Sequence, residues 1–246
     1  MTQHEIYSKI KKSRLNKKKR EDRPFHNFQL KTQRSQKLLQ NILVSISDKT
    51  CVKEALSQYV ISDITALEVY FKDVFLEIFD FFKDDKELLM RCSEGKLVEK
   101  NFSVEDLIII NREKIKIPEI ILGHQNFQNL SSINKVFSTI VGEDLFELLN
   151  KNKFHRGEPE DFTVPLRSDW YPMMKEYLDL RHTLTHDYTL KSKIDSQRIR
   201  ELHNNLECFV IAMDICIFYN FIKPRVETEI QNKKRSKKPI KNSSAT

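Results

Sequence analysis

Glycine is scarce in this sequence, with only 4 in 246 residues. No GxGxxG or GxxxxGK[ST] run occurs, which argues against folds that cradle phosphate with backbone amides. The four cysteines form no CxxC pair and have no short spacing, so neither a disulfide framework nor a thiolate zinc site is expected. Long apolar runs are also absent and the amino terminus is charged. We therefore expect a soluble, cytoplasmic protein with no secretory signal and no membrane span.

The net charge of +7 is concentrated at the two ends of the chain. Residues 1–20 hold eight Lys or Arg against one acid, and residues 223–246 hold eight against two, which leaves the middle at −6. Such composition favours disorder, so we predict disordered basic tails at 1–24 and 223–246 around a domain at 25–222. The charge pattern by itself leaves open whether these tails only solubilise the protein or bind RNA or another polyanion.

The body shows apolar residues at spacings of three and four, which predict amphipathic helices. The longest such segment runs from about Val52 to Phe82 and contains no Gly or Pro. Together these patterns predict an all-α bundle of four to five long helices. The other predicted helices cover residues 25–46, residues 131–150 as one bent or two short helices broken at Gly142, a stretch starting at Ser168 or Asp169, and a stretch from Asp195 to a stop at Pro224.

The segment from about 92 to 130 has a less regular pattern. Ser103-Val-Glu-Asp106 is typical of a capping box at a helix start. Residues 114–117 alternate as in a strand before Pro118. We interpret the segment as a helical or mixed insertion with a short hairpin.

The most unusual local sequence is Arg181-His-Thr-Leu-Thr-His-Asp-Tyr188, at the end of a predicted helix. On an ideal helix His182 and His186 lie one turn apart on the same face. Arg181 and His186 are about 140° apart around the axis, because each residue turns the helix by about 100°. They can act on one atom only if the helix ends or bends there, or if a second subunit completes the site.

Three interpretations of this constellation remain open. His182 and His186 have the HxxxH spacing of helical zinc sites, but Thr183 stands where HExxH needs glutamate and no third ligand follows. A second interpretation is a structural polar network at a helix end, where cations complement the helix dipole. The third uses Arg181 to stabilise a charged phosphate and histidine to move protons, a minimal set for cutting RNA without metal.

The spacing of Arg181, His186 and Tyr188 resembles the signature of HEPN-domain ribonucleases, with His182 at the polar position that often follows the arginine. Residues 59–75 also resemble the first helix of a HEPN domain, with Glu68 at the edge of its apolar face. Two other segments fit a bare Arg-x4–6-His pattern without these accessory features. They are Arg20/His26 and Arg198/His203.

The resemblance implies roles for individual residues. His186 would be a general acid or base, Arg181 would hold the phosphate, and His182 would orient the pair or touch the phosphate. Asp187 would support them. Tyr188 would be the residue modified in toxin pairs with a nucleotidyltransferase, or else a packing aromatic, and Glu68 would be a site residue or an ordinary solvated position.

The resemblance also implies an activity and its partners. It predicts a HEPN-like bundle that cleaves RNA as a homodimer, with no metal or other cofactor. The RNA could be tRNA or another structured RNA, and the protein would serve as a toxin or an anti-phage abortive-infection effector, with an antitoxin or regulatory partner. The alternative is a non-catalytic dimeric HEPN-like module that binds RNA or protein.

Overall fold

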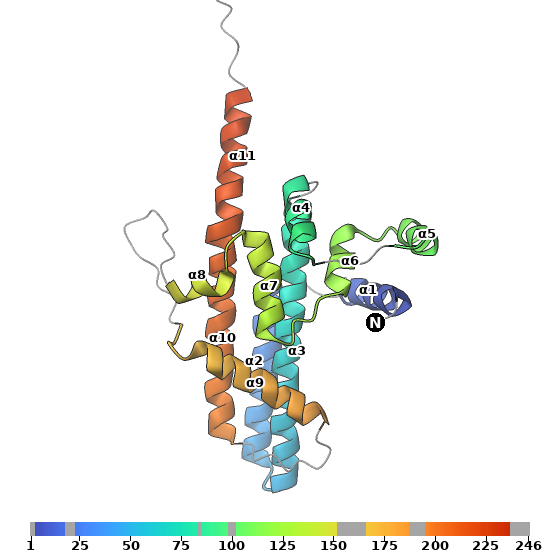
Figure 1. The fold of residues 1–246 in the computed structure, drawn as a ribbon. Helices are drawn as coiled ribbons and strands as arrows, with labels where there is room; N and C mark the ends of the chain where they lie inside the picture. Colours follow the sequence, from blue (N-terminus) through green and yellow to red (C-terminus); the bar gives the residue numbers. More distant parts are fainter. Residues whose placement is uncertain are drawn as a thin grey trace, which may run out of the picture.

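The computed structural model describes residues 3–17, 23–82, 85–97, 102–151, 166–186 and 195–236. Within these ranges the regular structure is helical and no strand occurs, which confirms the all-α class. Long helices run side by side through the body, and a smaller group of helices projects from one side (Figure 1).

The centre of the body is a pair of long helices, α2 (Pro24–Ser45) and α3 (Lys49–Phe81). Pro24 opens α2 at a position where its missing N–H costs no hydrogen bond. The Asp48 carboxylate caps α3 by accepting hydrogen bonds from the backbone N–H groups of Thr50 (2.7 Å) and Cys51 (3.0 Å). Both helices predicted here are confirmed, and α3 begins about one turn before the predicted start.

Three further predicted helical segments surround α3. The segment 131–150 forms two helices, α7 (Leu130–Val141) and α8 (Leu145–Lys151), because Gly142 ends α7 in the left-handed conformation, with φ of 92°. Helix α9 (Trp170–His186) crosses the front of the bundle, and α10 (Ser196–Ile217) runs along the length of the bundle behind it (Figure 1). The predicted loop at 151–167 lies almost entirely outside the described residues.

An aromatic cluster joins these helices into one core. The ring of Phe71 on α3 lies 5.3 Å from that of Phe137 on α7 and 6.2 Å from that of Phe209 on α10, centre to centre. Trp170, at the start of α9, stacks on Phe209 at 5.3 Å. Offset and edge-to-face ring pairs of this kind add to the area that each ring buries. The start of α9 is therefore fixed against both α10 and α3.

The prediction of a disordered tail at 1–24 is wrong for residues 3–17, which form helix α1 (Gln3–Lys17). Together with α5 (Val104–Arg112) and α6 (Ile117–Gly123), α1 forms the projecting group, which we call the arm (Figure 1). The arm has a small core of its own, and α1 joins it because its few apolar residues share one face. The buried members are Ile6, Tyr7, Ile10, Ile115 and Ile120.

Polar contacts and one glycine fasten α1 to the rest of the arm. The Arg14 guanidinium makes a bidentate ion pair with Glu119 on α6, at 2.5 and 2.6 Å, and donates to the carbonyls of Glu113 and Lys114. A Cβ on Gly123 would come within 2.6 Å of the Ile6 side chain, so the close approach of α6 to α1 requires glycine here. Residues 18–22 of the predicted tail lie outside the described residues.

The insertion is helical where the structure describes it. The capping box at Ser103 and Asp106 is confirmed, with both reciprocal hydrogen bonds present at the start of α5. A short helix, α4 (Lys86–Glu94), packs against α7. The predicted strand at 114–117 is wrong, because the chain turns at Lys114 (φ 49°) and Pro118 sits in the first turn of α6.

The prediction that the last long helix stops at Pro224 is also wrong. A π-helical turn, η1 (Phe218–Ile222), follows α10 and leads directly into α11 (Lys223–Ser236). Such a turn shifts the hydrogen-bond register and accommodates a proline, which lacks an N–H. The predicted disordered tail at 223–246 is therefore helical through residue 236, and residues 237–246 lie outside the described part.

Arg225 explains why the start of α11 stays on the bundle. Its guanidinium lies over the ring of Phe221 (4.5 Å) and close to that of Phe82 (5.7 Å), and it pairs with Asp85. The continuous stretch Ser196–Thr228 is long and apolar enough to cross a membrane by length and composition alone. Half of its most apolar window is buried inside the bundle, as in a core helix.

Candidate functional site

The candidate residues Arg181, His182 and His186 lie on the last turns of α9. The helix reaches His186 as a regular α-helix, so it does not end before that residue. Side chains of Thr183 and Thr185 donate to backbone carbonyls one turn earlier, including that of Arg181 (3.1 Å). Asp187 and Tyr188, the two other candidates from this motif, lie outside the described residues.

Arg181 is half-buried and points away from the histidine pair toward the α6–α7 loop. Its Nη1 donates to Gln128 Oε1 at 2.9 Å. The amide nitrogen of Gln128 in turn donates to Glu68 Oε2 on α3 at 3.0 Å. The sequence candidates Arg181 and Glu68 are therefore brought together by a residue from a third segment.

The Glu68 carboxylate is held in its charged form. Burial alone would raise the pKa of Glu68, but hydrogen bonds from Lys72 and Gln128 and the charge of Arg181 lower it below its ordinary value. An ionised Glu68 cannot donate a proton as a general acid. Its role in this arrangement is to orient the Gln128 amide so that the amide oxygen faces Arg181.

One buried atom of Arg181 is left without a hydrogen bond among the described residues. Its Nε is buried and has no partner among the described residues. Leaving a buried donor unsatisfied costs about 1–3 kcal/mol. The guanidinium therefore carries a local energetic cost at Nε in this arrangement.

The two histidines of the motif are exposed and touch each other. The rings of His182 and His186 lie 4.7 Å apart, centre to centre, in an edge-to-face arrangement. Neither ring forms a hydrogen bond or a ring contact with Arg181, which bonds to Gln128 instead. Because α9 is helical through His186, a single copy of the chain does not bring Arg181 and His186 to one point.

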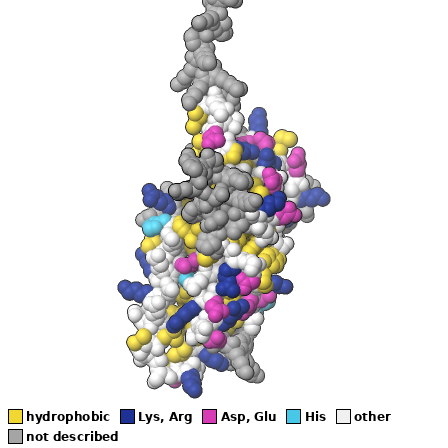
Figure 2. All heavy atoms as spheres, turned by 90° about the vertical axis from the view of Figure 1, so that its left-hand side faces the viewer, with side chains coloured by type: hydrophobic (Ala, Val, Ile, Leu, Met, Phe, Trp, Pro, Cys, Tyr) yellow, Lys and Arg dark blue, Asp and Glu magenta, His cyan; other side chains and the backbone are white. Residues whose placement is uncertain are grey.

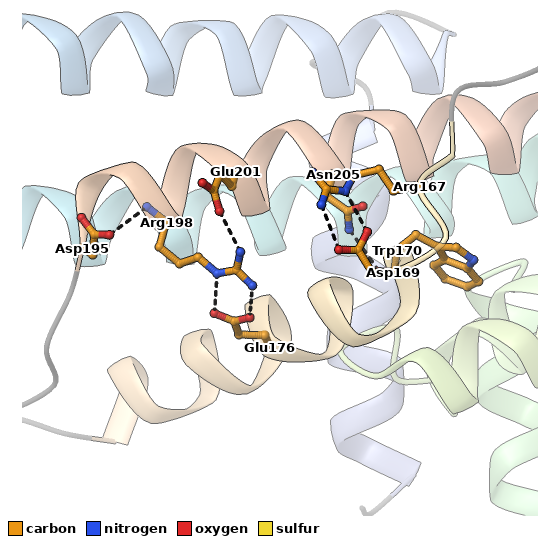
Figure 3. A network of polar contacts seen from close by, with 8 residues as sticks. All are labelled: Arg167, Asp169, Trp170, Glu176, Asp195, Arg198, Glu201 and Asn205. Carbon is orange, nitrogen blue, oxygen red and sulfur yellow. Dashed lines mark hydrogen bonds and ion pairs between the residues drawn. The ribbon is translucent and has the colours of Figure 1, made fainter.

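The second Arg-x4-His pattern in the described residues is fully used in packing. Arg198 on α10 pairs bidentately with Glu176 on α9, at 2.6 and 3.0 Å, and also with Glu201 at 2.7 Å (Figure 3). His203 is 1 % exposed and hydrogen-bonds to Asp63. Arg198 lies at the surface, but His203 is buried, so a substrate phosphate could not reach both members of this pair.

The metal interpretation of His182 and His186 lacks further ligands in the part of the chain described here. Those residues contain no group of three His, Cys, Asp or Glu side chains that could hold a metal ion. Two neutral imidazoles alone do not make a structural zinc site, which takes four ligands.

Charge is mixed on the face opposite the arm. Where this face is not hidden by grey atoms, Lys and Arg side chains alternate with Asp and Glu side chains over α9 and α10 (Figure 2). Ion pairs such as Arg198–Glu176 account for this alternation. No extended positive patch that could attract a polyanion is seen there.

Sequence reasoning did not identify Gln128. It lies 60 residues from Glu68 and 53 from Arg181, in the short loop that follows α6. No local pattern marks such a residue, because the link depends on how α3, α9 and the loop pack. No protein-family model, curated protein or solved structure matches this chain.

The link through Gln128 gives a testable prediction for the RNA cleavage that the resemblance to HEPN ribonucleases implies. Gln128→Met keeps the length of the side chain but removes both hydrogen bonds. Hydrogen bonds to charged groups contribute about 1.5–3 kcal/mol, so we expect kcat to fall about 10- to 100-fold with KM little changed.

A double exchange tests whether the link positions Arg181. In the Glu68→Gln, Gln128→Glu variant, the new amide can donate to the new carboxylate, which can still accept from Arg181. We expect this variant to recover most of the kcat that Gln128→Met loses. Equal loss in both variants would show that the link does not position the arginine.

Proposed function

We propose that the protein is a metal-independent endoribonuclease of the HEPN type, with an active site completed by a second copy of the chain. The observation that carries the proposal is the link from Glu68 through Gln128 to Arg181. It fixes a guanidinium one residue before the exposed His182, at the end of a helix in an all-helical bundle. The competing pair Arg198 and His203 is occupied by packing contacts.

In the proposed reaction the 2′-oxygen of a ribose attacks the adjacent phosphorus. A neutral His186 imidazole takes the 2′-OH proton, and a protonated imidazole gives a proton to the 5′-oxygen as its bond to phosphorus breaks. The products are a 2′,3′-cyclic phosphate and a 5′-hydroxyl. Arg181 stabilises the negative charge that develops on the phosphoryl oxygens.

A homodimer accounts for two features of the site. It gives two equivalent composite sites, in each of which the exposed histidines of one chain supply the base and the acid. It also places the Arg181 of the other chain near these histidines, which a regular helix does not do within one copy. An RNA- or protein-binding module without activity is the alternative that the test below separates.

The test is incubation of the purified protein with total RNA and isolated tRNA in excess EDTA. We expect discrete fragments on a denaturing gel with wild type, none with His186→Ala, and cyclic phosphate ends on the products. Fragments with 5′-phosphate ends that form only when Mg²⁺ replaces EDTA would instead indicate metal-assisted cleavage. Absence of cleavage, with RNA still shifted on a native gel, would assign the protein to the binding class.

A further inference from the structure

A large groove lies between the arm and the body of the molecule, along the face of α3 that turns toward α1 and α6. Its volume is about 1150 Å³. Sites for small molecules usually occupy about 300–1000 Å³, so the groove is larger than such a ligand needs. Along α3 it is lined from Glu68 to Phe82, a distance of about 21 Å at the rise of an α-helix. A polymer segment fits these dimensions.

The rim of the groove is positively charged although the body of the chain is acidic. Seven Lys or Arg line the groove against four Asp or Glu, a surplus of three positive charges. One of the seven, Arg14, is committed to fastening α1 to α6. The other six are Lys9, Lys12, Lys17, Lys72, Lys114 and Lys116, of which Lys72 is ion-paired with Glu68.

The folding of α1 places these charges. Its apolar face packs into the arm, which turns Lys9, Lys12 and Lys17 toward the groove. Lys17 and Lys116 share Asp80 as an ion-pair partner, at 3.5 and 2.9 Å. Lys12 and Lys114 are exposed and have no ion-pair partner among the described residues.

The floor and one end of the groove differ in chemistry. The floor is apolar, with Val69, Leu76 and Phe79 from α3 and Leu122 from α6. The end near Glu68 carries the amide side chain of Asn126 from the α6–α7 loop. An apolar floor can accept base faces, amides can hydrogen-bond base edges, and a lysine rim can hold phosphates.

The groove ends at the residues that hold the candidate arginine. Glu68 and Gln128 line it, and the same two residues make the hydrogen-bonded link to Arg181. We propose that this groove binds a single-stranded segment of RNA and guides it to Arg181. The inference rests on the proposed nuclease function and names the path of its substrate.

The binding test uses single-stranded RNA of about 12 nucleotides, a length within the usual site size of such grooves. The RNA carries 2′-O-methyl groups, which remove the attacking hydroxyl and so separate binding from cleavage. The groove variant is Lys12→Glu, Lys114→Glu. The matched control is Lys31→Glu, Lys37→Glu, which changes two exposed lysines of α2 that do not line the groove.

We expect the groove variant to bind this RNA at least about tenfold more weakly than the control. Its plot of log affinity against log salt should be shallower by about 1.4, because each lost phosphate contact on a single strand removes about 0.7. Equal affinities and slopes in the two variants would overturn the proposal.

A second measurement does not depend on the variants. RNA containing 4-thiouridine is crosslinked to wild type, and the modified peptides are mapped. Crosslinks in α1 and in residues 114–128 are expected, and crosslinks confined to other surfaces would overturn the proposal.

A competition experiment tests the other class of occupant. Displacement of RNA by an acidic amphipathic peptide that itself binds more tightly would assign the groove to a protein helix instead.

These outcomes are distinct from failure of the nuclease proposal. If wild type cleaves RNA in EDTA while the groove variant binds normally, the groove assignment fails and the nuclease stands. If RNA binds in the groove but is not cut, the nuclease proposal fails and the groove remains an RNA-binding site.

Discussion

Replacing Arg181 by alanine is expected to lower the cleavage rate about 10²- to 10³-fold, the usual effect of removing one group that stabilises transition-state charge. Arg181→Lys should recover only part of the loss. Lysine keeps the charge but lacks the planar guanidinium, which can hydrogen-bond to Gln128 and to a phosphate at the same time. Single-turnover cleavage of a defined RNA measures both variants.

Arg198→Ala is the matched control for this prediction. This variant removes the arginine of the other Arg-x4-His pattern. The guanidinium of that arginine forms ion pairs with Glu176 and Glu201. We expect cleavage within about twofold of wild type, with a melting temperature lower by a few degrees for a loss of about 1 kcal/mol. Equal loss of cleavage in both arginine variants would contradict the assignment of the site to α9.

Mixing two inactive variants tests whether two chains share the site. A dimer of one Arg181→Ala chain and one His186→Ala chain keeps one composite site with both native residues. Random exchange should therefore restore about a quarter of the wild-type rate, because half of the dimers are mixed and each has one intact site. No recovery after verified subunit exchange would place the arginine and histidine of each site on the same chain.

The largest expected effect on stability concerns Asp63, which joins three helices inside the core. Its Oδ2 accepts hydrogen bonds from Tyr177 on α9 (2.8 Å) and from Nδ1 of His203 on α10 (2.7 Å). Removing one partner of a buried pair costs about 3–5 kcal/mol. Asp63→Ala should lower the melting temperature by about 10 °C, against less than about 2 °C for Glu54→Ala at an exposed position of the same helix.

The same cluster predicts how stability depends on pH. Burial alone would lower the pKa of His203, but the hydrogen bond to Asp63 and the neighbouring carboxylates of Asp63 and Glu207 raise it to about 9. The carboxylates that face the imidazole are Asp63 and Glu207, whose Oε1 lies 3.4 Å from Nε2, and the Tyr59 ring packs at 5.5 Å. A raised folded-state pKa means that protonated His203 stabilises the native state.

This contribution is fully present below about pH 6.5, the unfolded value, and is lost as pH rises toward 9. Burial also raises the pKa of Asp63, which acts in the same direction. Urea unfolding of wild type and His203→Gln measures the effect. The difference between their unfolding free energies should shrink as pH rises from 6.5 to 9. A constant difference would show that His203 carries no charge in the folded protein.

The sequence by itself determined most helices of the body, because their signals are local. Apolar spacing marked α3, the Ser103 capping box marked α5, and Gly142 marked the break between α7 and α8. Each signal depends on residues within a turn or two along the chain. The motif at 181–188 was likewise visible because its members lie within eight residues of sequence.

Tertiary structure decided what depends on distant partners. The charge count predicted a disordered tail at the amino terminus. Three apolar residues of α1 instead pack into a small core in the arm, and the lysines of α1 then line the groove. Pro224 does not end the helix, because a π turn precedes it and Arg225 holds α11 against Phe82.

The same reasoning separates the two arginine–histidine patterns. In sequence, Arg198 and His203 share the spacing of Arg181 and His186. Only packing shows that Arg198 is paired with Glu176 and that His203 is buried against Asp63. Packing also supplies Gln128, which no spacing relates to Arg181. Local hydrogen bonds and periodicity set the helices, whereas long-range contacts decided which of their side chains stay available for chemistry.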